Sequence, residues 1–101
     1  MRIVGGVVLL LIVLGVGALI VAPKSAVATI TTSSANVRAG PGTGFAVVAA
    51  YSKSIELKVA GRNEAGTWLA VTTPNDEKGW ISATVVTTTV EIEKLPVVES
   101  P

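Results

Sequence analysis

The 101-residue sequence contains no cysteine and no histidine. Disulfide bonds and thiolate metal sites are therefore excluded, and so is nucleophilic catalysis by a cysteine–histidine pair. Serine and threonine are frequent, but no imidazole is present to activate their hydroxyl groups. The residue types of this chain therefore predict a protein that is not an enzyme and that holds no metal and no cofactor.

Charged side chains are also few, with eight Lys and Arg residues against seven Asp and Glu residues. The five basic residues between positions 29 and 87 are scattered, whereas a nucleic-acid-binding surface needs them clustered on one face. Asp76 and Glu77 lie beside Lys78 in a predicted turn, and we interpret them as a solvated charge cluster. A glycosidase pair needs two carboxylates across a cleft, for which a domain of about sixty residues leaves little space. We therefore expect no nucleic acid partner and no hydrolytic site.

A long uncharged stretch covers residues 3–22, in which every residue is apolar or glycine. A helix of twenty residues is about 30 Å long, the thickness of a bilayer core. Arg2 precedes this stretch and Pro23 follows it, and the basic start favours an N-terminus inside the cell and a remainder outside. A buried core helix is not compatible with this pattern, because about sixty further residues cannot cover a helix that is apolar on every side.

Two interpretations of this apolar segment remain open. One is an uncleaved membrane anchor, since signal-peptide apolar cores usually span about 7–15 residues. The other is a cleaved signal peptide, because residues 26–28 (Ala-Val-Ala) form a small-x-small cleavage motif. Residues 1–28 are thus predicted to be a transmembrane anchor or a signal peptide. Both alternatives place the domain outside the cytoplasm, as a single-pass membrane protein or as a protein secreted after cleavage at Ala28.

Residues 29–87 consist of short β-branched runs separated by glycine, proline and polar residues, which is typical of several short strands. The clearest is residues 55–60, in which Ile55, Leu57 and Val59 alternate with charged residues. Residues 33–45 are predicted to form an irregular loop, because they contain a dense run of glycine and proline. Strands are expected at 28–32, 46–51, 55–60, 68–72 and 79–82, with a short closing one at 85–86.

Five or six strands in about sixty residues predict an all-β fold, a small and partly open barrel that follows one apolar N-terminal helix. Residues 88–101 contain three glutamates and two prolines and are predicted to form a flexible C-terminal tail, in preference to an added edge strand. The expected core residues are Val37, Val48, Leu57, Val59, Leu69, Val71, Ile81 and Val86.

Residues 36–45 (Asn-Val-Arg-Ala-Gly-Pro-Gly-Thr-Gly-Phe) resemble the opening motif N-V-R-x-G-P-x-T-x-[FY] of the bacterial Src-homology-3 (SH3b) domain family. The V-x-G at 59–61, the W-x-x-V at 68–71 and the G-W-I at 79–81 resemble later motifs of that family in the same order. The resemblance covers about residues 28–87. It implies an SH3-like barrel that acts outside the cytoplasm as a binding module for peptidoglycan or short peptides.

The sequence departs from the family pattern at two places. Ser54 stands where the family often has glycine before its third strand. Residues 85–86 (Val-Val) stand where an aromatic–leucine pair often ends the domain, which removes an aromatic that lines the ligand groove. The second departure weakens any transfer of ligand specificity from the family to this chain.

The four aromatic residues are the remaining candidates for a binding surface. One interpretation is a shallow platform that holds a peptide or the face of a sugar; the other is that both tryptophans close the ends of a thin core. An arginine at the start of the loop can brace that loop or contact a ligand. The candidate ligand-binding residues are Arg38, Phe45, Tyr51, Trp68 and Trp80. Two further functions stay open, namely a membrane-anchored protein–protein adaptor and a structural spacer without a ligand.

Overall fold

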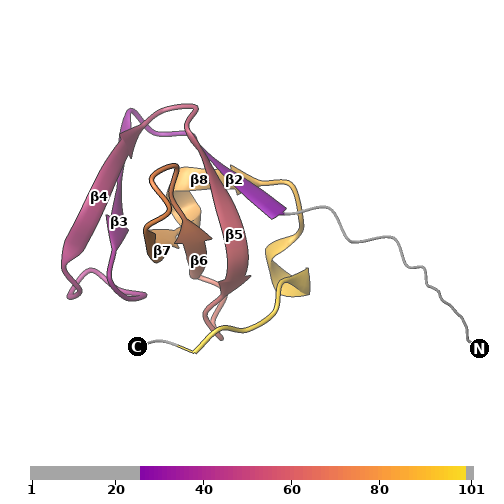
Figure 1. Cartoon of the computed structure of the whole chain (residues 1–101). Helices are drawn as coiled ribbons and strands as arrows, with labels where there is room; N and C mark the ends of the chain where they lie inside the picture. The colour runs from indigo at the N-terminus through magenta and orange to yellow at the C-terminus, as the bar shows by residue number, and fades with distance from the viewer. Residues whose placement is uncertain (1–25, 100–101) are drawn as a thin grey trace, which may run out of the picture.

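Seven short strands form one curled sheet in the computed structural model, which describes residues 26–99. Their order across the sheet is β4-β3-β7-β6-β5-β2-β8, and every neighbouring pair is antiparallel. Figure 1 shows the β3–β4 hairpin at one side of the barrel, with β2, β5 and β8 at the other. The strands are β2 (Ala26–Ile30), β3 (Ser34–Arg38), β4 (Val47–Ser52), β5 (Glu56–Arg62), β6 (Trp68–Thr72), β7 (Lys78–Ser82) and β8 (Val86–Thr88).

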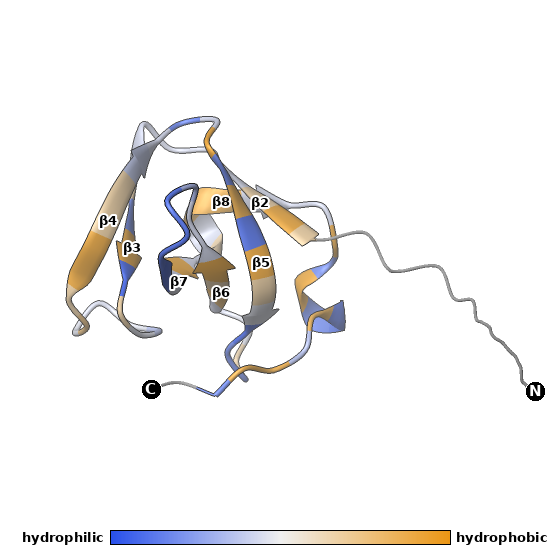
Figure 2. Cartoon of the chain, viewed as in Figure 1, coloured by the Kyte–Doolittle hydropathy of each residue, from blue (hydrophilic) through white to orange (hydrophobic). Residues whose placement is uncertain are grey.

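The predicted all-β class is confirmed. The sheet is open, with β4 and β8 as its two edges, and is consistent with the predicted SH3-like fold. The strand predicted at 68–72 has the observed bounds of β6. Figure 2 shows the expected alternation of polar and apolar residues along β5. This alternation puts one side of each strand into the core and the other toward solvent.

The prediction of an irregular segment at 33–45 is wrong for its first half, where β3 forms. Ala35 and Val37 are buried, while Ser34 and Asn36 are exposed, so β3 has the period of a half-buried strand. β4 pairs with one side of β3 and β7 with the other. The sheet therefore has seven strands in the described residues, in place of the five or six predicted.

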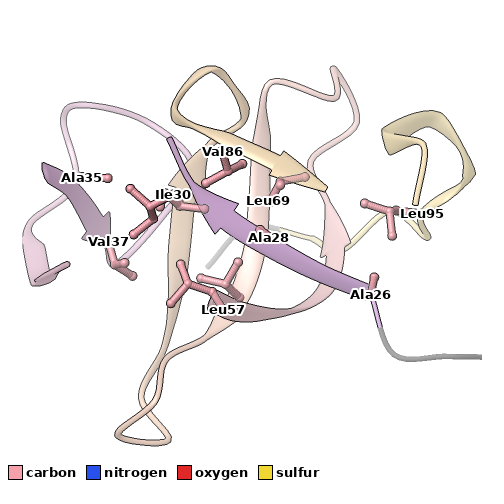
Figure 3. Close-up of a cluster of buried hydrophobic side chains, with 11 residues drawn as sticks. Ala26, Ala28, Ile30, Ala35, Val37, Leu57, Leu69, Val86 and Leu95 are labelled. Atoms are coloured by element: carbon pink, nitrogen blue, oxygen red, sulfur yellow. The ribbon is translucent and has the colours of Figure 1, made fainter. Parts of the chain in front are cut away.

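A cluster of aliphatic side chains fills the barrel (Figure 3), with Ile30, Leu57 and Leu69 among its most buried members. Six of the eight predicted core residues belong to it, and Val59 is half-buried against it. Val48 was predicted to be buried but is 40% exposed. The reason is a register shift in the β3–β4 pair: Ala49 lies opposite Val37 and Val47 lies opposite Arg38, which leaves Val48 as an extra residue.

Residues 88–99 do not form the predicted flexible tail, because they pack along the barrel. Thr88 belongs to β8, and a 3-10 turn follows at Ile92–Lys94. Leu95 is 7% exposed and belongs to the core cluster. Burial of one leucine side chain favours folding by about 1.5–3 kcal/mol. It adds to the backbone hydrogen bonds that tie Thr89 to Val27 and Pro96 and Val98 to Arg62.

The predicted apolar helix lies in residues 1–25, outside the described part of the chain. Among residues 26–99, no helix combines the length and the apolar character that a bilayer crossing requires. Ala26 and Ala28 are buried in β2, and Ala28 has no exposed surface. Residue 28, after which the domain boundary was predicted, lies inside β2.

Ser54 adopts a φ of 77° in the turn between β4 and β5. This left-handed conformation costs a non-glycine residue about 1–2 kcal/mol, because its Cβ crowds the following carbonyl oxygen. It explains why a glycine suits this position, as in the family that the sequence resembles.

Replacing Ser54 with glycine is expected to raise the free energy of unfolding by about 0.5–1 kcal/mol, since the relief of strain exceeds the added entropy of the unfolded chain. Urea unfolding measures the change. The matched control is Ser52→Gly in β4, where the backbone is extended. The Ser52→Gly control should lower the free energy of unfolding. A Ser54→Gly domain that is no more stable than the Ser52→Gly domain would show that Ser54 is not strained.

A domain that starts at Thr29 is expected to be less stable than one that starts at Ala26. The shorter domain lacks the pairs of Ala26, Val27 and Ala28 with β5 and the buried methyl group of Ala28. The loss should reach at least about 2 kcal/mol, because several hydrogen bonds and core contacts disappear together. Urea unfolding of the two domains tests this, and equal midpoints would be the contrary outcome.

Candidate functional site

The two tryptophans lie on the outer face of the sheet, the side opposite to the core. In the β6–β7 pair, Trp68 lies opposite Ser82, and Ala70 lies opposite Trp80. The residues between them, Leu69 and Ile81, are fully buried in the core. Because successive side chains alternate between the two faces, the tryptophans are diagonal neighbours on the outer face.

A groove of about 320 Å³ lies on this outer face and contains Trp80 in its lining. Trp80 is 5% exposed, but it does not belong to the cluster that fills the barrel. Beside it lie the small residues Ala39, Ala60 and Ala70, whose short side chains leave the groove open. The polar residues of the lining are Thr72, Lys78 and Glu99. The result is a largely apolar hollow with a few polar groups, and its two charges have opposite signs.

Arg38 holds the loop that follows β3. One of its guanidinium nitrogens, Nη1, donates hydrogen bonds to the carbonyl oxygens of Thr43 at 3.2 Å and Phe45 at 2.9 Å. The Phe45 ring lies over Gly40, where any side chain would overlap the ring. Arg38 also lies opposite Trp80 in the β3–β7 pair, so the loop it braces stands next to the groove. The bracing interpretation of Arg38 is confirmed by these contacts.

Trp68 and Tyr51 occupy other surroundings. Trp68 is half-buried, and its backbone N–H donates to the side-chain oxygen Oδ1 of Asn63 at 3.0 Å. Tyr51 lies opposite Ala35 and packs against the core cluster, and its hydroxyl accepts a hydrogen bond of 3.5 Å from Nδ2 of Asn75. The five candidate residues therefore do not form one continuous platform.

Of the five, Trp80 lines the groove, Arg38 and Phe45 build the adjacent loop, Trp68 shares the face, and Tyr51 packs against the core. Ligand binding by any of them stays a prediction. The alternation along residues 68–71 predicts Ala70 on the face of Trp68, opposite to Leu69 and Val71, and the pairing of Ala70 with Trp80 agrees. No signal in the sequence could have placed Glu99 in the lining of the groove that contains Trp80, because this groove joins segments far apart in the chain.

Within residues 26–99, no group of three or more acidic side chains gathers at a spacing that suits a metal ion. The groove itself contains one carboxylate, on Glu99, and one ammonium group, on Lys78. These two groups and the Thr72 hydroxyl can exchange hydrogen bonds with a ligand. The arrangement can bind a neutral molecule that carries both donors and acceptors.

Replacing Arg38 with alanine is expected to lower the free energy of unfolding by about 1 kcal/mol, because two hydrogen bonds to the loop are lost. Amide hydrogen exchange at Ala39 and Phe45 should become faster. The control is Lys53→Ala, which removes an exposed basic side chain from the turn between β4 and β5. If both variants behaved alike, Arg38 would not brace the loop.

Comparison with known proteins identifies the family of this domain. The family model described as "Bacterial SH3 domain" matches residues 33–87, which is more than half of the chain. Comparison with curated proteins and with solved structures gave no match. The matched segment runs from the start of the β3–β4 hairpin into β8 and includes Arg38, both tryptophans and most of the groove. Bacterial SH3 domains are commonly binding modules, often for the cell wall, and this chain belongs to the bacterial SH3 domain family.

Proposed function

We propose that this chain is a non-catalytic, extracytoplasmic binding module that recognises peptidoglycan components or short peptides through the groove beside Trp80. The observation that carries the proposal is the position of Trp80 on the outer face, among small side chains that keep the hollow open. Ligand sites in proteins are typically apolar hollows with a few polar groups, and this groove has that character.

The groove suits a short, partly apolar ligand. Its volume of about 320 Å³ lies at the lower end of the range for small-molecule sites, which matches one sugar ring or a few peptide residues. The methyl groups of the lining alanines, with the small exposed part of the Trp80 indole, offer an apolar surface for a methyl group or a peptide side chain. Lys78 and Glu99 have opposite charges and can contact the carboxylate and amide groups that peptides carry.

The apolar N-terminal stretch supports a location outside the cytoplasm. Residues 23–25 separate it from β2, and three extended residues span at most about 10 Å. The burial of Ala28 in β2 supports a retained membrane anchor over cleavage at Ala28, because cleavage there would cut the strand. A retained anchor would hold the binding module close to the outer surface of the membrane.

A membrane-anchored adaptor for a protein partner is the second candidate function. The observation in its favour is the apolar surface at the edge strand β4, where Val47 is 48% exposed and Val48 is 40% exposed. Edge strands with exposed apolar side chains are surfaces on which other chains can pair. The partner would then pair along β4.

Replacing Thr72 with tyrosine is expected to reduce binding to purified sacculi by at least about tenfold, because the larger side chain fills the groove. Thr72 is half-buried in the groove wall, so the substitution adds atoms to the hollow and leaves the core intact. A co-sedimentation titration with sacculi measures the binding. The matched control is Glu56→Tyr, which adds the same ring to an exposed position on β5.

Two results would contradict this proposal. One is binding to sacculi that Thr72→Tyr leaves unchanged, which would place the ligand elsewhere on the chain. The other is the absence of saturable binding by the unmodified chain, which is the behaviour expected of a structural spacer. Urea unfolding of each variant confirms that a loss of binding is not a loss of fold.

A further inference from the structure

The C-terminal segment 96–99 adds a short parallel pairing to a sheet whose named strands are all antiparallel. Val97 bridges Arg62 in parallel orientation. The Arg62 N–H donates to the carbonyl oxygen of Pro96 at 2.9 Å, and the Val98 N–H donates to the carbonyl oxygen of Arg62 at 2.8 Å. The segment lies past the end of the β2–β5 pairing, which begins at Ala26 opposite Val59. It therefore covers an edge of β5 that β2 leaves free.

Gly61 allows this close approach. A Cβ atom at this position would lie 2.5 Å from the carbonyl oxygen of Pro96 and would also overlap the side chain of Val98. Contacts this short between non-bonded atoms are not tolerated, so any side chain at residue 61 must displace the segment. Gly61 belongs to the V-x-G motif on β5, and its role here is to admit a second backbone.

Leu95 anchors the C-terminal segment firmly, whereas the residues after Leu95 are held weakly. Leu95 is 7% exposed and belongs to the core cluster. After it, Pro96 and Glu99 are exposed, Val97 is 51% exposed, and Val98 is half-buried. What holds residues 96–98 is mainly hydrogen bonding between backbones, which any extended peptide can supply. The Arg62 guanidinium adds one bond, from Nε to the carbonyl oxygen of Leu95 at 3.1 Å.

The same segment separates two hollows. Val98 and Glu99 line the groove beside Trp80, and they also line a second groove of about 380 Å³ that contains Pro41 and Asn63. In Figure 1 the C-terminal segment passes the end of β5, in line with its position between the two grooves. A chain that replaced residues 96–98 on β5 would therefore have open space on both sides for its side chains.

We propose that the edge of β5 at residues 60–62 is a strand-addition site for an extended peptide of a partner protein, and that residues 96–98 are its internal competitor. The peptide would run parallel to β5 and carry small apolar side chains, because the Pro-Val-Val of the chain itself shows which chemistry fits beside Gly61. Tethering gives the internal segment an effective concentration in the millimolar range, so a partner binds well once this segment is weakened or released. The inference goes beyond the proposed function and does not require that the groove bind a cell-wall ligand.

The test uses the full chain in a mild detergent and a fluorescent synthetic peptide with the sequence of residues 93–99. The substitution Val98→Asp weakens the internal competitor and leaves β5 unchanged. It should tighten binding of the peptide at least about tenfold relative to the unmodified chain, as measured by fluorescence anisotropy. Adding Gly61→Ala to Val98→Asp should abolish binding, because the methyl group occupies the position of the added strand. Gly44→Ala is the matched control, since a Cβ there meets nothing within 4 Å.

A second version of the test does not depend on the folding of the Gly61 variant. A peptide that carries aspartate in place of the second valine should fail to bind the Val98→Asp chain. The inference is overturned if the unmodified and Val98→Asp chains bind the peptide equally, or if neither Gly61→Ala nor the altered peptide reduces binding. Sacculus binding by the Thr72→Tyr chain reports separately on the proposed function, because Thr72 lines the groove and lies on β6, away from the C-terminal segment.

Discussion

The antiparallel register of β6 against β7 is the constraint on which both the core and the groove depend. With Ala70 opposite Trp80, the pair Leu69 and Ile81 enters the barrel and Trp80 faces outward. A slip of one residue in either strand would exchange the two faces of that strand. Its tryptophan would then point into the space that aliphatic side chains fill, and its core residue would point toward solvent. One set of backbone hydrogen bonds thus decides what stabilises the domain and what is available to a ligand.

A barrel of this size has few apolar side chains, so segments on both sides of the family match complete it. β2 contributes Ala28 and Ile30 to the core, and the C-terminal segment contributes Leu95. All three lie outside residues 33–87, the part that matches the bacterial SH3 family. Small domains bury a modest fraction of their surface, which makes each added side chain count. The folded unit is therefore longer than the family match at either end.

Local patterns predicted much of this fold, and long-range contacts account for what they missed. The alternation in β5 and β6 identified Leu57, Leu69 and Val71 as core residues, because side-chain direction in a strand follows from position alone. Val48 was misplaced because a bulge shifts the register by one residue, and bulges depend on the partner strand. β3 was missed because its polar residues alternate over a short span next to a glycine-rich loop. In the candidate site, Trp80 was identified, but its neighbours from the C-terminal segment were not.

The groove and the edge of β5 share Val98 and Glu99, and this sharing couples them. A ligand of the groove that contacts these residues stabilises the C-terminal segment in place, whereas a peptide that replaces the segment on β5 removes part of the groove wall. Thermodynamic linkage makes such effects reciprocal, so each ligand weakens the other by the same factor. Because Gly61 is the residue that lets the segment approach β5, a single position of the V-x-G motif controls both surfaces. In the proposed exchange, the chain passes from a state with residues 96–98 on β5 to a state with a partner peptide in their place. The weak backbone pairing of residues 96–98 sets how readily this exchange occurs.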